Sequence, residues 1–66
     1  MQIVVNGATR EVANGLTIAR LLEELNVETK HVAVEVNLQL VPRGRHAEHA
    51  LSPGDRLEVV TLVGGG

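Results

Sequence analysis

The sequence predicts an α+β domain, in which one main helix covers one face of a mixed sheet of four to five strands. Several short runs of β-branched and other aliphatic residues are separated by turn residues, which is typical of strands. Between these runs, Ile or Leu recurs at the spacing of one helix face. A chain of 66 residues corresponds to a single domain.

The N-terminal segment predicts a β-hairpin. Residues 1–6 are mostly aliphatic and form the first predicted strand. Asn6 and Gly7 tolerate the positive φ angles that both central positions of a two-residue hairpin turn require. Residues 10–13 form the predicted return strand, which is short and partly polar, as edge strands often are.

A short amphipathic helix follows the hairpin. Asn14 and Gly15 interrupt the strand, and Thr17 can cap a helix by accepting a backbone N–H bond. Asn26 is the expected stop. The apolar stripe between them predicts that the helix covers one face of a sheet. Its members are Ile18, Leu21, Leu22 and Leu25.

The second half predicts three further strands. Residues 32–37 place Val32, Val34 and Val36 on one face. Residues 38–41 continue into a short strand, which Pro42 ends because proline has no N–H. Residues 43–50 are polar and predict about one helical turn. Residues 52–55 predict a tight turn, and residues 57–62 form the final strand.

This order of elements is that of the β-grasp arrangement of ubiquitin. The long apolar final strand is expected in the centre of the sheet, parallel to the first strand. The domain is expected to span residues 1–63, and Gly64, Gly65 and Gly66 are expected to form a flexible tail.

The composition limits the possible classes of function. The chain has no cysteine, and therefore neither a disulfide nor a thiolate metal site. A net charge of −2 and the absence of aromatic residues argue against nucleic-acid binding. No apolar run approaches the roughly 20 residues that span a bilayer, and no signal peptide is recognisable, so we expect a cytoplasmic chain without membrane contact. So small a core has no room for a ligand pocket of about 300–1,000 Å³, which argues against a free-standing enzyme.

The terminal glycines are the candidate reactive group. Residues 63–66 could extend about 13 Å and deliver a terminal carboxylate into a narrow channel of another protein. A carboxylate is a poor electrophile and needs activation, usually as an acyl-adenylate, and side chains beside it would obstruct the reaction. The alternative is that the glycines are a linker or a frayed end.

Alternation along the final strand predicts an exposed apolar surface. Leu57, Val59 and Thr61 are expected under the helix, whereas Val60 and Leu62 face the other way. Together with Val4 and Val63, these outward residues form a candidate partner interface. The alternative is that loops bury both sides of the strand.

Two histidines are close enough in sequence to be candidate metal ligands. His46 and His49 could share one side of a helical turn, but no third ligand is near, so solvated loop histidines are expected rather than a zinc site. Arg43 and Arg45 form a small basic spot that is also expected to be solvated.

The sequence resembles the thiamine-biosynthesis sulfur carrier proteins, the ThiS family, over essentially its whole length. Three features depart from that family: a third terminal glycine, His46 where an aromatic residue is common, and Leu38 where a small or polar residue is typical. The matching segments are residues 1–7, 16–25, 32–37 and 41–43, then Leu51, Gly54, Asp55, residues 57–59, Gly65 and Gly66.

The resemblance implies a carrier rather than an enzyme. Gly66 would be adenylated by an activating enzyme and converted to a thiocarboxylate with sulfur from a cysteine desulfurase. Thiazole synthase would then accept the sulfur. No cofactor would be bound by the chain, since the activating enzyme would use the ATP. The alternatives are the sulfur carrier of molybdopterin synthesis and a ubiquitin-like binding module without covalent chemistry.

Overall fold

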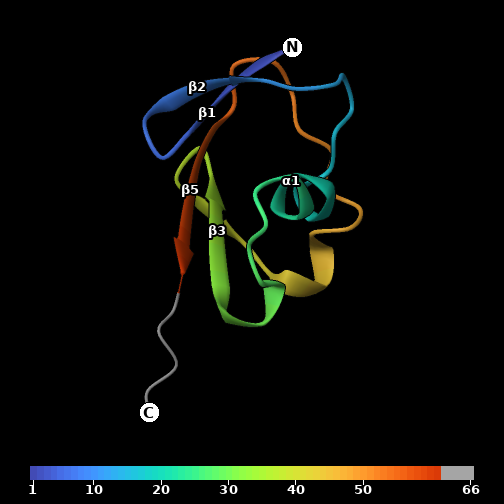
Figure 1. The fold of residues 1–66 in the computed structure, drawn as a ribbon, viewed down its shortest axis with the longest axis vertical. Helices are drawn as coiled ribbons and strands as arrows, with labels where there is room; N and C mark the ends of the chain where they lie inside the picture. Colours follow the sequence, from blue (N-terminus) through green and yellow to red (C-terminus); the bar gives the residue numbers. More distant parts are fainter. Residues whose placement is uncertain (62–66) are drawn as a thin grey trace.

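The computed structural model describes residues 1–61, apart from the side chain of Thr29. This part of the chain forms one α-helix, α1 (Ile18–Glu24), and a five-stranded sheet of order β2-β1-β5-β3-β4 (Figure 1). Two 3-10 turns, η1 (Thr29–His31) and η2 (Arg43–Arg45), complete it. The strands are β1 (Gln2–Val5), β2 (Ala8–Glu11), β3 (Val32–Val36), β4 (Gln39–Val41) and β5 (Arg56–Thr61).

The last strand, β5, lies in the centre of the sheet. It is parallel to β1, with Val5 opposite Leu57, and antiparallel to β3, with Val32 opposite Thr61. The predicted β-grasp arrangement and the predicted position of the final strand are therefore confirmed.

The first hairpin closes with the predicted turn. Asn6 and Gly7 have φ angles of 50° and 82°. The return strand was predicted at residues 10–13, but β2 begins at Ala8, which lies opposite Val5. That boundary was wrong because a two-residue turn allows pairing to resume at once, even through polar residues.

The helix begins and ends as the sequence indicates. Thr17 caps it by accepting the Arg20 N–H at 3.3 Å. Asn26, just after the C-cap residue Leu25, has a φ of 57°, a conformation that ends a helix. Of the predicted stripe, Leu25 is partly buried and three residues are fully buried: Ile18, Leu21 and Leu22.

One core joins the helix to the sheet. The buried helix residues pack with Ile3, Val34 and Leu57 of the three central strands. Figure 1 shows α1 and the segment that follows β4 on the same side of the sheet. The opposite face of the sheet is left uncovered.

The segment between η2 and β5 is bonded to the start of α1 through main-chain atoms. His46 and His49 accept the N–H groups of Ala19 and Ile18 at 3.0 and 3.1 Å. The Leu51 N–H donates in return to a carbonyl just before the helix, at 2.8 Å. Two of the N–H groups that a helix start leaves without partners are thus satisfied by this loop.

His46 is buried, so the prediction of a solvated loop histidine was wrong for this residue. Its side chain is only 4% exposed, and its Nε2 lies 3.0 Å from the Val41 carbonyl oxygen. A carbonyl can only accept, so Nε2 carries the hydrogen. The ring lies between α1 and the end of β4 because the carbonyl of His46 is held by the helix. The polarity of a loop does not reveal which of its residues takes such a position.

We predict that His46→Ala lowers the free energy of unfolding by about 2–4 kcal/mol, because it leaves a cavity and removes the bond to Val41. His49→Ala is the matched control and should cost less than about 1 kcal/mol, since within residues 1–61 His49 makes hydrogen bonds through its main chain alone. Urea denaturation of both variants measures the difference. Equal losses would contradict a structural role of the His46 ring.

Candidate functional site

The predicted reactive residue and its tail lie outside the described residues. These are Gly64, Gly65 and Gly66, and the predicted interface residues Leu62 and Val63 lie outside the described residues too. What the structure describes is the strand that leads to them. β5 is paired with β3 as far as Thr61, its last described residue. The chain therefore enters its C-terminal segment from the centre of the sheet.

The predicted interface residues Val4 and Val60 lie on the uncovered face. Val4 is opposite Arg56, and alternation along β5 places Val60 on the same side. Val60 is 50% exposed, whereas Val4 is partly buried. Thr61 was expected under the helix but is exposed, because α1 does not reach that end of β5.

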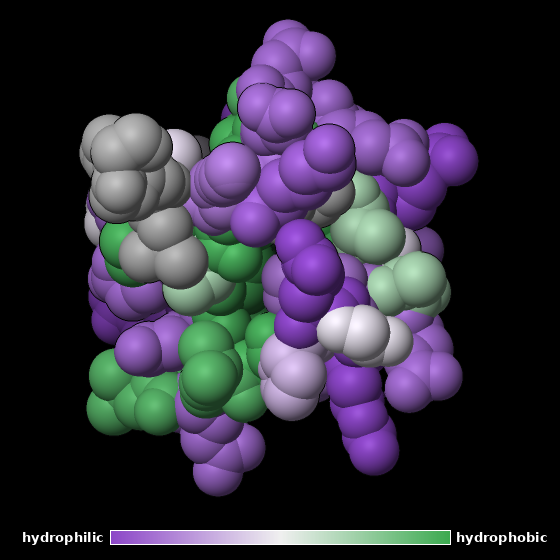
Figure 2. Space-filling view, turned by 90° about the horizontal axis from the view of Figure 1, so that it is seen from below, coloured by the Kyte–Doolittle hydropathy of each residue, from purple (hydrophilic) through white to green (hydrophobic). Residues whose placement is uncertain are grey.

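Two exposed leucines of the second hairpin were not predicted to be part of this site. Leu40 lies opposite Glu35, faces away from the helix and is 65% exposed. Leu38 is 89% exposed and lines a shallow hollow with Val4. We call Val4, Leu38, Leu40 and Val60 the apolar surface. Figure 2, which views the molecule from below Figure 1, shows that apolar groups are exposed among hydrophilic ones at that end of the molecule as well.

Leu38 adopts a backbone conformation that leucine rarely takes. Together with Asn37 it forms a two-residue turn, with φ angles of 51° for Asn37 and 71° for Leu38. The equivalent position of the first turn is occupied by Gly7. Asn37 could have indicated this turn, but the sequence gives no signal that a leucine accepts a left-handed conformation.

Acidic side chains lie within the apolar surface. Glu35 and Glu58 are directly opposite each other on β3 and β5, and both are exposed. Like charges in this arrangement destabilise a sheet. They also keep the uncovered face polar, which lowers its tendency to aggregate.

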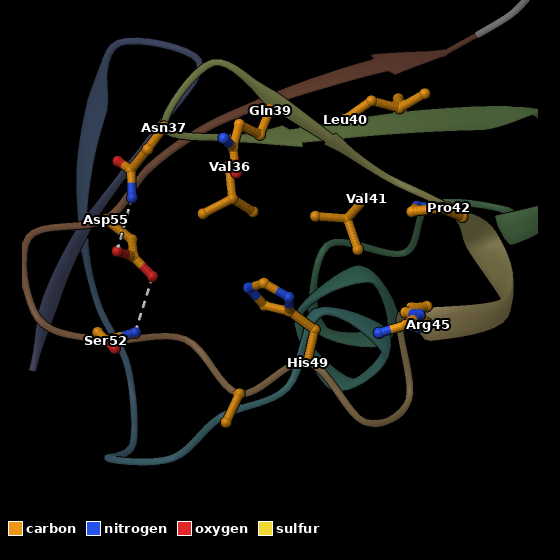
Figure 3. Close-up of a pocket in the computed structure, with 11 residues that line it drawn as sticks. Val36, Asn37, Gln39, Leu40, Val41, Pro42, Arg45, His49, Ser52 and Asp55 are labelled. Carbon is orange, nitrogen blue, oxygen red and sulfur yellow. Dashed lines mark hydrogen bonds between the residues drawn. The ribbon is translucent and has the colours of Figure 1, made fainter.

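A second hollow lies between the β3–β4 hairpin and the segment that returns to β5 (Figure 3). Its only acidic residue, Asp55, accepts bonds from the Asn37 side chain at 3.0 Å and from the Ser52 N–H at 2.8 Å. Both oxygens of Asp55 are thus engaged in holding the turn before β5. His49 and Arg45 line the opposite wall.

The described part of the chain contains neither a candidate metal site nor a candidate membrane span. Within residues 1–61, no three His, Cys, Asp or Glu residues are grouped so that they could hold a metal ion. In the same range, α1 is the one α-helix, and it is too short to cross a membrane.

Both the sequence and the strand order of this chain have counterparts among known proteins. The sequence model of the ThiS family matches residues 3–66. The chain belongs to the ThiS family. It is 35% identical to the sulfur carrier protein ThiS of Escherichia coli, and the match covers 100% of both chains. A crystal structure of the thiamine biosynthesis protein ThiS from Geobacter metallireducens superposes with a TM-score of 0.86 at 32% identity, again over both full chains.

ThiS-like sequences also occur within longer proteins. The chain is 44% identical over 66 residues to a thiazole synthase of Paramagnetospirillum magneticum, and 38% identical to one of Magnetococcus marinus. It spans only 20% of the length of each of these proteins. In both relatives, a ThiS-like segment therefore forms part of a polypeptide named as a thiazole synthase.

We predict that Leu38→Gly raises the free energy of unfolding by about 1 kcal/mol, because glycine adopts a positive φ without the steric cost that leucine pays. The matched control is Leu40→Gly, which removes an exposed leucine from a strand and should lower stability by about 0.5–1 kcal/mol. Urea denaturation of the two variants measures whether each substitution raises or lowers the free energy of unfolding. A loss of stability in Leu38→Gly would show that the turn is not strained.

Proposed function

We propose that this chain carries sulfur for thiamine biosynthesis on the carboxyl group of Gly66. Membership of the ThiS family over residues 3–66 supports this function, as does the full-length similarity to a protein named as a sulfur carrier. The single observation that carries the proposal is structural. β5, the central strand of the sheet, ends at Thr61, only two residues before the terminal glycines in the sequence.

The proposed chemistry begins with activation of the carboxylate. Its oxygen attacks the α-phosphorus of ATP on an activating enzyme, pyrophosphate leaves, and the terminus becomes an acyl-adenylate. The outer sulfur of a cysteine desulfurase persulfide then attacks the carbonyl carbon and AMP leaves. A thiol then attacks the cysteine sulfur of the resulting acyl disulfide, forms a new disulfide with the desulfurase cysteine, and releases a thiocarboxylate on Gly66. Glycine suits these steps because it places no side chain beside the reacting carbon.

The proposed acceptor is thiazole synthase. Two relatives contain a segment like this chain within a thiazole synthase polypeptide, which supports a direct association between the two parts. The activating enzyme and the cysteine desulfurase follow from the family resemblance, and ATP is bound by the activating enzyme rather than by this chain. We propose that these reactions take place in the cytoplasm.

The apolar surface is the proposed docking site for these partners, together with Leu62 and Val63. Val60 is half exposed on the strand that leads to the tail, so it lies close to any enzyme that receives Gly66. Leu38 and Leu40 extend this surface to the far end of the sheet. Exposed apolar groups framed by charges are typical of transient protein interfaces.

We predict that incubation with ATP, the activating enzyme and a persulfide sulfur source exchanges one carboxylate oxygen of Gly66 for sulfur. Intact-mass spectrometry detects the corresponding gain, and fragmentation locates it. Deletion of Gly65 and Gly66 should abolish the gain. Unchanged loading after this deletion would overturn the proposal, and so would the absence of any gain with the cognate enzyme.

We further predict that Val60→Asp lowers the kcat/KM of loading by about tenfold or more, because it places a charge in the centre of an apolar contact. Ala47→Asp, on the exposed loop after η2, is the control and should load normally. Leu38→Gly should also load less well, although its fold is stabilised, so its loss cannot be due to unfolding. Normal loading in both Val60→Asp and Leu38→Gly would exclude the apolar surface as the docking site.

A further inference from the structure

The side chain of Asn6 is bonded to the central strand near its C-terminal end. Its Oδ1 accepts the Val59 N–H at 2.8 Å, and its Nδ2 donates to the Val59 carbonyl at 3.1 Å. The main-chain N–H of Asn6 donates to Leu57 at 2.9 Å. Asn6 thus makes three hydrogen bonds to β5, two through its side-chain amide and one through its main-chain N–H.

These two side-chain hydrogen bonds take the place of the main-chain pairing that β1 does not provide beyond Val5. β1 accompanies β5 only as far as Val5, opposite Leu57, because the chain then turns towards β2. On the other side, β3 continues to Thr61. The amide of Asn6 offers one acceptor and one donor, as a neighbouring strand would, and so extends the pairing of β5 to Val59.

We propose that Asn6 is a positioning residue for sulfur loading, which fixes the direction in which β5 leads into the C-terminal segment. The proposal rests on the function proposed for Gly66. Among the described residues, Val60 and Thr61 follow Val59 and are paired only with β3, so the bonds of Asn6 are the last ones that hold β5 on its other side. A change in the direction of β5 at Val59 would alter where the reacting carbon is presented, and misplacement by about 1 Å can lower a rate by two orders of magnitude.

The second hairpin contains a matched control for Asn6. Asn37 has nearly the same φ angle, 51° against 50°, and its side chain also binds the region of β5. Its Oδ1 accepts the Arg56 N–H at 3.0 Å, and its Nδ2 donates to Asp55 at 3.0 Å. These bonds hold the start of β5 rather than the end that leads to Gly66. Asn37→Gly therefore removes an equivalent side chain without affecting the proposed exit direction.

The test compares Asn6→Gly and Asn37→Gly in the full chain. Glycine keeps the positive φ at both positions, so each variant loses only the side-chain bonds. For Asn6→Gly we expect the Val59 amide to exchange its hydrogen about tenfold faster, as the loss of two hydrogen bonds implies. We also expect the kcat of sulfur loading to fall by about tenfold, with little change in KM because the docking surface is intact. Asn37→Gly should change neither quantity.

Asn6→Asp separates the two bonds, since it keeps the acceptor for the Val59 N–H but places an oxygen opposite the Val59 carbonyl. The exchange rate of Val59 in this variant should lie nearer to that of the unmodified chain than in Asn6→Gly. Equal kcat values for Asn6→Gly and Asn37→Gly, measured with faster Val59 exchange in the first, would overturn the positioning role. If the unmodified chain gains no sulfur, the function proposed for Gly66 fails instead, and the exchange data still show whether Asn6 holds Val59.

Discussion

A seven-residue helix can cover only one face of a five-stranded sheet, and this constraint determines how the two faces differ. The hydrophobic core on the covered face consists of aliphatic side chains, because the chain contains no Phe, Tyr or Trp. Each large aliphatic side chain that is fully buried contributes about 1.5–3 kcal/mol, so residues such as Ile3 and Leu57 are hard to replace. The uncovered face contributes less to this core, and it carries the docking site proposed above.

The two hairpin turns meet the central strand from opposite sides, since Val5 and Val36, the residues before the turns, both lie opposite Leu57. Each presents an asparagine with a positive φ angle, and each asparagine binds β5 or the turn before it. The strand that leads to the glycines is therefore held at its start by Asn37 and near its end by Asn6. The second positions of the turns differ, since Gly7 adopts its conformation freely whereas Leu38 is strained and exposed. A leucine at that position is easier to explain by contact with a partner than by folding.

Local patterns allowed most of the fold to be predicted, and tertiary packing accounts for what was missed. The stripe of Ile18, Leu21 and Leu22, the cap at Thr17 and the turn at Asn6 depend on neighbouring residues, and all three were confirmed. The burial of His46 depends on how a loop meets α1 and β4, which no local pattern encodes. The exposure of Leu38 follows from a backbone conformation that its residue type disfavours. The family was recognised from the order of elements and the terminal glycines, whereas the reacting end itself lies outside the described residues.

The strand order has a consequence for synthesis of the protein. The hairpins β1–β2 and β3–β4 can form from contacts between neighbouring residues, but neither is paired with the other until β5 lies between them. On the ribosome, the sheet therefore closes only after residues 56–61 have left the exit tunnel. A product interrupted before that point lacks the strand that joins the two hairpins, and with it the finished sheet face that carries Val60. Formation of the single core is thereby linked to synthesis of β5.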